Sequence, residues 1–200
     1  MLKDKVNTVT RKLPTWPVYL LGALYPVWLL YQGLTGGLGV DPVKVMENSL
    51  GEAGLQLLIL GLVVTPLRKF TGITLLKFRR SIGLLAFFYI FLHLLVWLVL
   101  DVQILSQIWA DILKRPYITI GMAGFVLMLP LAVTSNNWSV RRLGRRWNRL
   151  HKLTYGVALL GGLHFVMLVK GFQIEPLVYA AVILVLLALR WSPTRRSARA

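Results

Sequence analysis

The sequence predicts an all-α, polytopic membrane protein with six transmembrane helices and both termini in the cytoplasm. Of its 200 residues, 56% are hydrophobic, and the mean hydropathy is +0.67, both typical of a membrane protein rather than a soluble domain. The apolar residues form six separate runs, and basic residues collect in every second connection between the runs. We therefore expect one transmembrane domain over residues 1–200.

The six runs have the length that a membrane-spanning helix needs. Such a helix takes about 20 mainly apolar residues, because ~1.5 Å per residue must cover ~30 Å of hydrocarbon. The expected spans are 16–34, 52–67, 82–100, 116–134, 150–169 and 176–191. The second span is the shortest and ends at Thr65-Pro66. No alternating apolar pattern predicts strands, and open sheet edges are not tolerated in lipid.

The segments around the first two spans carry helix signals of their own. The first span follows a basic tail without a small-x-small cleavage site, which predicts an uncleaved span rather than a signal peptide. After a glycine-rich turn, Asp41-Pro42 is typical of a helix start, with an N-cap residue followed by proline at the first helical position. This predicts a short outer helix to about Leu50. Ser49 and Glu52 have capping-box spacing and predict the start of the second span.

The charge distribution sets the orientation. Most of the 23 basic residues lie in the N-terminal tail, the second and fourth connections and the C-terminal end: Lys3, Lys5, Arg11, Lys12, Arg68, Lys69, Lys77, Arg79, Arg80, Arg141, Arg142, Arg145, Arg146, Arg149, Lys152, Arg190, Arg195, Arg196 and Arg199. The other connections hold the remaining four, Lys44, Lys114, Arg115 and Lys170, together with every acid except Asp4. The positive-inside rule places the basic connections in the cytoplasm.

Composition also excludes several classes. The net charge of +16 would suit a nucleic-acid ligand, but its confinement to short connections indicates membrane orientation instead. The chain has no cysteine, which excludes disulfides, thiolate-held iron–sulfur clusters and covalent haem. The arginine-rich stretch Arg141–Arg149 is expected to form an interfacial helix, with Leu143, Trp147 and Leu150 toward lipid.

Three histidines, His93, His151 and His164, lie in or beside the third and fifth spans. A single intramembrane histidine is either functional or a packed residue bonded to a neighbouring helix. His93 follows the last basic residue before its span by 13 residues, and His164 does so by 15. Both therefore lie ~20 Å above the cytoplasmic surface. Two neutral imidazoles at one depth on parallel spans predict a bis-histidine haem site.

His151 lies about 20 Å below His164, at the cytoplasmic end of the fifth span. At that depth the third span offers Arg80 or Ser81 rather than histidine. We expect His151 to serve an inner redox site, either as an iron ligand or facing a flavin or a quinone head group. The basic residues around it either set topology and contact lipid head groups, or pair with haem propionates or a flavin phosphate.

The two histidines of the fifth span do not share one face of a regular helix. Positions 13 residues apart differ in direction by roughly 140°. The span contains three glycines that either bend the helix or allow close packing against a neighbour: Gly156, Gly161 and Gly162.

Three stretches carry a resemblance to a known family: Gly36–Lys44 (GGLGVDPVK), Arg115–Gly121 (RPYITIG) and Arg141–Tyr155 (RRLGRRWNRLHKLTY). Together with His93 and His164, they resemble the MsrQ (YedZ) family, the haem-binding membrane subunit of the bacterial periplasmic protein-methionine-sulfoxide reductase system. The resemblance covers nearly the whole chain and implies a ferric-reductase-like, haem-binding helical bundle. Relatives with that domain usually carry two histidines on each of two helices, whereas this third span has one.

The resemblance implies an electron-transfer subunit in the bacterial inner membrane. Electrons from the quinone pool or a cytoplasmic flavin reductase would pass outward to a periplasmic, molybdopterin-containing subunit that repairs methionine sulfoxide in oxidised proteins. The catalytic reduction would belong to that partner. The implied cofactors are haem b, one or two, and FMN. His93 and His164 would be the axial ligands of the outer haem iron, and His151 would serve the inner site.

The acidic residues of the outer connections have two possible roles, and two other functions predict different sequence features. The outer acids, Asp41, Glu47, Asp101 and Asp111, either help to dock the partner or form ordinary solvated surface. A proton-coupled transporter using intramembrane histidines would predict carboxylates inside the spans, and none lies well inside an expected span. A non-catalytic assembly subunit would need no intramembrane histidine pair.

Overall fold

The computed structural model describes residues 2–169 and 171–190, and these residues form helices and short connections with no strand among them. Several residues used in the sequence analysis lie outside this part of the chain: Lys170, Trp191 at the end of the expected sixth span, and Arg195, Arg196 and Arg199.

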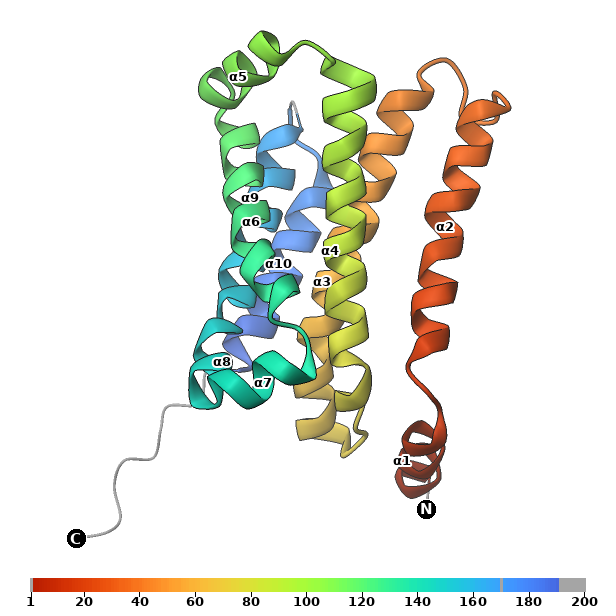
Figure 1. The fold of residues 1–200 in the computed structure, drawn as a ribbon, viewed down its shortest axis with the longest axis vertical. Helices are drawn as coiled ribbons and strands as arrows, with labels where there is room; N and C mark the ends of the chain where they lie inside the picture. The colour runs from red at the N-terminus through yellow and green to blue at the C-terminus, as the bar shows by residue number, and fades with distance from the viewer. Residues whose placement is uncertain (1, 170, 191–200) are drawn as a thin grey trace, which may run out of the picture.

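Long helices run side by side along the long axis of the molecule (Figure 1). They are α2 (Trp16–Leu34), α3 (Pro42–Thr71), α4 (Arg79–Leu95), which the π-helix η2 (Val96–Val102) continues, α6 (Pro116–Val133), α9 (Leu153–Leu168) and α10 (Ile174–Ala188). Short helices cover the two ends of this bundle. At one end lie α1 (Leu2–Lys12), η1 (Leu76–Phe78), α7 (Asn137–Leu143) and α8 (Arg145–Leu150), and at the other lies α5 (Leu105–Lys114).

Several helices are long and apolar enough to cross a membrane. Within the described residues, three qualify: Pro42–Thr71, Leu76–Val102 and Pro116–Val133. Lys3–Lys12 and Trp16–Leu34, bent by 82° relative to each other, make a fourth if they count as one span. Large apolar side chains such as Leu21 and Val27 of α2 are exposed on the bundle, as lipid-facing residues are. The chain is therefore a helical membrane protein.

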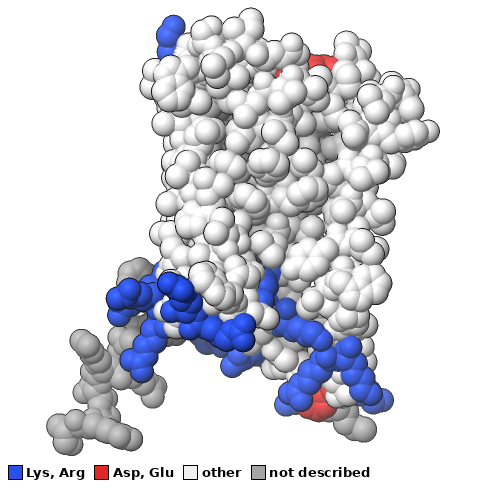
Figure 2. Space-filling model, in the orientation of Figure 1, with Lys and Arg blue, Asp and Glu red and all other residues white. Residues whose placement is uncertain are grey.

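Charge divides the molecule along its long axis. In the view of Figure 2, lysine and arginine side chains gather at the end that carries α1, α7 and α8, and the broad band above them shows almost no charge. A band without charge is what the hydrocarbon layer requires, because an unpaired charge in lipid is costly.

The expected outer helix and second span are one 30-residue helix, α3. Asp41 caps it, because its carboxylate accepts a 3.0 Å hydrogen bond from the backbone N–H of Lys44, and Pro42 takes the first position. No helix starts at Ser49, so the expected capping box does not form. Glu52 therefore lies about 15 Å along α3 rather than at a helix start.

The helix of the expected fifth span, 150–169, begins at Leu153 rather than at Leu150. The chain turns at His151 and Lys152, between α8 and α9. Helix α9 stays regular through its three glycines, which serve close packing rather than a bend. A Cβ added to Gly162 would lie 3.0 Å from Ile183 of α10, and one on Gly161 would lie 3.2 Å from Leu55 of α3.

An arginine just after α10 stabilises the end of α3. Pro66 has no N–H, so the carbonyl of Leu62, four residues earlier, has no partner within its helix. The Arg190 guanidinium donates to this carbonyl through Nη2, and through Nη1 to the Tyr155 hydroxyl at 3.2 Å. The buried Leu62 side chain belongs to the core between α3, α4, α6, α9 and α10, so Arg190 ties the end of α10 to that core.

Candidate functional site

The structure brings the rings of His93 and His164 together across the bundle. His93 comes from α4 and His164 from α9, and their ring centroids are 6.4 Å apart with the planes at 78°. Two imidazole nitrogens bound to one metal ion at about 2 Å each are ~4 Å apart, which places the ring centroids about 6 Å apart. The observed separation therefore matches that of two imidazoles on opposite sides of one iron.

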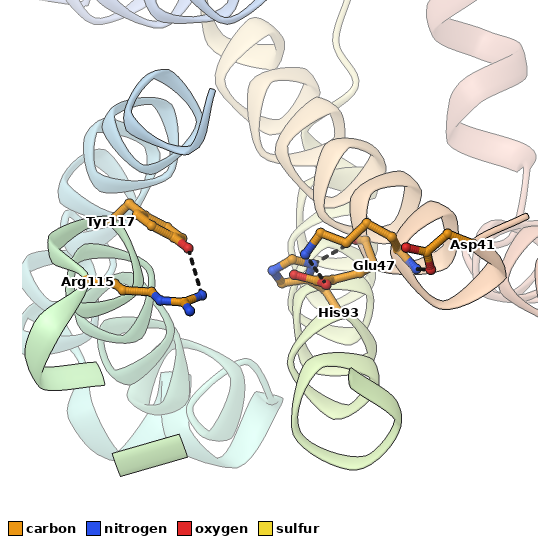
Figure 3. Close-up of polar contacts among 6 residues, drawn as sticks. Asp41, Glu47, His93, Arg115 and Tyr117 are labelled. Carbon is orange, nitrogen blue, oxygen red and sulfur yellow. Dashed lines mark hydrogen bonds and ion pairs between the residues drawn. The ribbon is translucent and has the colours of Figure 1, made fainter. Parts of the chain in front are cut away.

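Each of these rings is oriented by a backbone carbonyl of a neighbouring helix. His93 Nδ1 lies 2.8 Å from the carbonyl oxygen of Glu47 on α3, and His164 Nδ1 lies 2.7 Å from that of Tyr117 on α6. A carbonyl only accepts, so Nδ1 carries the proton in both rings and donates it. Nε2 is then left with a free lone pair, the arrangement found in metal-binding histidines. Figure 3 shows the second ring nitrogen of His93 pointing away from α3.

Two glycines make room for these hydrogen bonds. A Cβ on Gly51 would lie 3.0 Å from His93 Nδ1, and a Cβ on Gly121 would lie 2.9 Å from His164 Nδ1. Any larger residue at either position would push against the imidazole. The glycines therefore let each ring approach the carbonyl that orients it.

The two halves of the site repeat each other. Residues 51–55 read GEAGL and residues 121–125 read GMAGF. The hydrogen-bonded pairs Glu47–His93 and Tyr117–His164 are separated by 46 and 47 residues. Hairpin α3–α4 and hairpin α6–α9 thus present their histidines in the same way. Sequence reasoning missed the orienting residues, and this repeated spacing is the signal that would have found them.

Each hairpin carries a cation near its orienting residue, and Figure 3 shows Arg115 beside Tyr117. Lys44 of α3 pairs with Glu47, with 2.7 Å between Nζ and Oε2. Arg115, just before α6, pairs with Asp111 at 3.2 Å and donates to the Tyr117 hydroxyl at 3.4 Å. Each residue that orients a ring therefore has a cation two or three positions before it in the sequence, and both cations are paired with carboxylates.

The acids expected to dock a partner divide into two kinds. Glu47 and Asp111 are buried and paired with the two cations, so neither is free surface. Asp41 is exposed but caps α3, and Asp101 is exposed in η2.

The structure places His151 apart from the pair, at the basic end of the bundle. Thr134 Oγ1 donates to the Pro130 carbonyl at 2.6 Å, so its oxygen accepts from His151 Nε2 at 3.1 Å. His151 therefore carries its proton on Nε2, unlike His93 and His164. Trp147 stacks on the His151 ring with 3.8 Å between centroids. The expectation that Trp147 faces lipid is wrong, because Arg141–Arg149 forms two helices that turn at Gly144 (φ +50°) and bring the indole onto His151.

Two arginines of α4 act on His151. Burial, together with the positive charges of Arg79 and Arg80, lowers the pKa of the His151 imidazole below its usual value of 6.5. Arg80 also donates to the side chain of Asn137 at 2.7 Å, and Ser81 is buried. Within the described residues this end of the bundle has one histidine and a concentration of positive charge.

Comparisons with known proteins give a consistent result. The family of ferric reductase like transmembrane components matches residues 50–162, a range that includes His93 and His151 and ends two residues before His164. A "Protein-methionine-sulfoxide reductase heme-binding subunit MsrQ" of Brucella anthropi is 50% identical over 186 residues, which cover 92% of this chain and 83% of the relative. Relatives of the same name in Brucella ovis and Brucella canis are 52% identical, covering 88% of this chain and 80% of theirs. No solved structure matches.

Proposed function

The chain belongs to the MsrQ family of protein-methionine-sulfoxide reductase heme-binding subunits, within the ferric-reductase-like transmembrane components, and from that premise we propose that it is a haem b-containing electron-transfer subunit. It takes electrons from the quinone pool or a cytoplasmic flavin reductase and passes them outward to a periplasmic, molybdopterin-containing subunit. That partner reduces methionine sulfoxide in oxidised proteins. The observation that carries the proposal is the facing pair of His93 and His164.

We propose that the protein lies in the bacterial inner membrane with six crossings by α2, α3, α4 with η2, α6, α9 and α10. Both termini and the basic end face the cytoplasm. The support is the concentration of lysine and arginine at one end of the bundle and the preference of basic connections for the cytoplasmic side. The histidine pair then belongs to the outer half of the membrane.

The residues around the pair fit a haem. His93 and His164 would bind the iron through Nε2, because Nδ1 of each ring is already bonded to a carbonyl. Lys44 and Arg115 would hold the two propionates, since each hairpin supplies one cation at its outer end. When bound, the haem supplies a one-electron iron couple. The chain orients the two imidazoles and surrounds them with apolar helices that exclude water.

The basic end fits an anionic cofactor. Arg79 and Arg80 supply positive charge for a phosphate such as that of FMN, and His151 lies beside them. His151 donates a hydrogen bond from Nε2–H to Thr134, so we propose it as a contact of the inner cofactor rather than as a second iron ligand.

An absorption spectrum of the detergent-purified protein tests the proposal. We expect reduced b-type haem bands in the wild type. These bands are expected to be lost in His93→Ala and in His164→Ala, because each variant removes one of the two imidazoles that would hold the iron. His151→Ala is the matched control, since it removes the third histidine and leaves the outer pair complete.

Two outcomes would contradict the proposal. A colourless, haem-free protein that supports full methionine-sulfoxide reduction in membranes would exclude the proposed role. Bands of unchanged intensity and position in both axial variants would exclude these two residues as the ligands.

A further inference from the structure

A cavity of about 460 Å³ lies along α3, on the side that faces α2 and α4. Its walls include Tyr25 of α2, Tyr89 of α4, and Ser49, Glu52, Gln56 and Leu60 of α3. Tyr25, Gln56 and Leu60 are exposed at the surface of the bundle, so the cavity opens sideways toward lipid. Its volume is in the range of small-molecule sites.

The cavity is lined by the carboxylate of Glu52, of which only one oxygen accepts hydrogen bonds from the described residues. Glu52 Oε1 accepts from the Gln56 amide at 2.8 Å and from the Tyr179 hydroxyl at 2.8 Å. Within the described part of the chain, Oε2 makes no further hydrogen bond. Because an ionisable group inside a membrane span is expensive, it indicates a function by default. Oε2 is the acceptor that a ligand in this cavity would meet.

The residues that line the cavity indicate which class of ligand it binds. Because the cavity opens toward lipid, it favours a molecule dissolved in the membrane over a solute from water. The Glu52 carboxylate disfavours a phospholipid phosphate, because like charges repel, and favours a neutral hydroxyl donor. Tyr25 and Tyr89 stack on each other, with their rings parallel within 2° and their centroids 6.2 Å apart, and they give the cavity one aromatic wall suited to an aromatic ring.

The cavity lies next to the histidine pair. Tyr89 precedes His93 by four residues on α4, and residues four apart on a helix are neighbours about 5–6 Å apart. On α3, Gly51 contacts the His93 ring, and Glu52 is the next residue. A ligand in the cavity is thus separated from His93 by about one turn of helix.

We propose that this cavity binds the head group of a lipid-soluble quinol, with Glu52 accepting a hydrogen bond from one of its hydroxyl groups. The proposal rests on the proposed function, because it identifies which of the two donor classes reaches the protein and where it binds. The quinol's tail extends past Leu60 into the lipid, and its ring lies between Tyr25 and α3.

The test uses the haem-loaded protein in nanodiscs and decylubiquinol as the probe. Binding is followed by quenching of tryptophan fluorescence, since Trp28 stacks on Tyr25 at 5.9 Å, and electron delivery by the absorbance of the reduced haem. Glu52→Gln is expected to weaken quinol binding roughly tenfold, the usual effect of losing one hydrogen bond to a charged group. Ala53→Phe fills the cavity and is expected to abolish both signals. Ala181→Phe, on the exposed face of α10, is the matched control.

The outcomes separate this proposal from the proposed function. Chemical reduction by dithionite and the b-type spectrum stay unchanged in all three variants if only the quinol site is affected. Unchanged quinol affinity in both cavity variants overturns the inference, as does native mass spectrometry that finds a phospholipid in the wild type and none in Ala53→Phe. A protein without haem would contradict the proposed function instead, and quinol binding would still be measured by fluorescence.

Discussion

At the scale of single residues, the position of one proton distinguishes the three histidines. In His93 and His164 the Nδ1–H group donates a hydrogen bond to a carbonyl and Nε2 is free, whereas in His151 the Nε2–H group donates to Thr134. The proposed roles follow this difference: Nε2 is available for a metal ion in His93 and His164, and it is occupied by a hydrogen bond in His151.

The glycines beside the rings give the first prediction. Gly51→Ala places a methyl group 3.0 Å from His93 Nδ1 and is expected to turn the ring away from its carbonyl. Disturbing a group that orients a metal ligand lowers metal affinity by roughly 10–100-fold, so haem content after purification should fall. Gly83→Ala on the neighbouring helix is the control, because no atom lies within 4 Å of its added methyl group. Equal haem content in the two variants would contradict the prediction.

The paired cations give the second prediction. Arg115→Gln or Lys44→Gln removes a positive charge beside the proposed haem, and reduced haem is less positive than oxidised haem. Each variant is therefore expected to lower the midpoint potential in a redox titration, where ~59 mV corresponds to a tenfold change in a one-electron equilibrium. Lys114→Gln changes the same charge at the adjacent, exposed position and should shift the potential less. A larger shift in Lys114→Gln would argue against the assigned propionate contacts.

The environment of His151 gives the third prediction. Its folded-state pKa lies below the ordinary value because of burial and the charges of Arg79 and Arg80, so the unfolded chain binds more protons at mildly acidic pH. The free energy of unfolding is then fully retained above about pH 6.5 and falls as the pH decreases through the folded-state pKa. His151→Gln keeps a donor for Thr134 but does not titrate. Thermal unfolding in detergent should therefore be less sensitive to acid in the variant than in the wild type.

The sequence predicts that His93 and His164 lie close together, but it does not predict which groups orient their rings. Counting residues from the last basic position of each connection placed His93 and His164 at one depth, and their rings are indeed neighbours. Glu47 and Tyr117 act through backbone carbonyls, which every residue has, so their side chains carry no signal of the role. Similarly, nothing in the sequence around His151 indicates that a turn before α9 directs it to Thr134.

At the scale of helices, Pro66 and Arg190 form one structural unit and give the fourth prediction. Arg190→Met leaves the Leu62 carbonyl without a partner, which costs about 1–3 kcal/mol for a buried group. Pro66→Ala restores the missing N–H within α3, so the cost of Arg190→Met should shrink in that background. The free energy of unfolding of the two single variants and the double variant, measured in mixed micelles, gives this coupling directly. Additive effects would show that the proline is not what Arg190 compensates.

The helix boundaries show why sequence signals succeed or fail at this scale. Trp16–Leu34 was predicted to the residue, because the apolar run and the helix end together at the glycine-rich turn. The capping-box pattern at Ser49 and Glu52 predicted a helix start inside α3, yet the cap at Asp41 had already started that helix. Helix α5 was not predicted. It is short and lies across the end of the bundle, where neither span length nor the charge rule gives a signal.

At the scale of the whole molecule, the proposed orientation gives the fifth prediction. The chain has no cysteine, so single cysteines report on accessibility without background. Leu113→Cys on exposed α5 should react with a membrane-impermeant maleimide in intact spheroplasts. Asn148→Cys on exposed α8 should react only after the membrane is permeabilised. The reverse pattern would invert the protein and place the histidine pair in the inner half of the membrane.

The contact between Arg190 and α3 also has a consequence for biosynthesis. The ribosome releases α3 long before Arg190, which lies 128 residues after Leu62, whose carbonyl it satisfies. Until the last helix has been made and inserted, the nascent protein keeps an unpaired backbone group in the membrane. A chain that terminates before Arg190 would retain this unpaired carbonyl permanently.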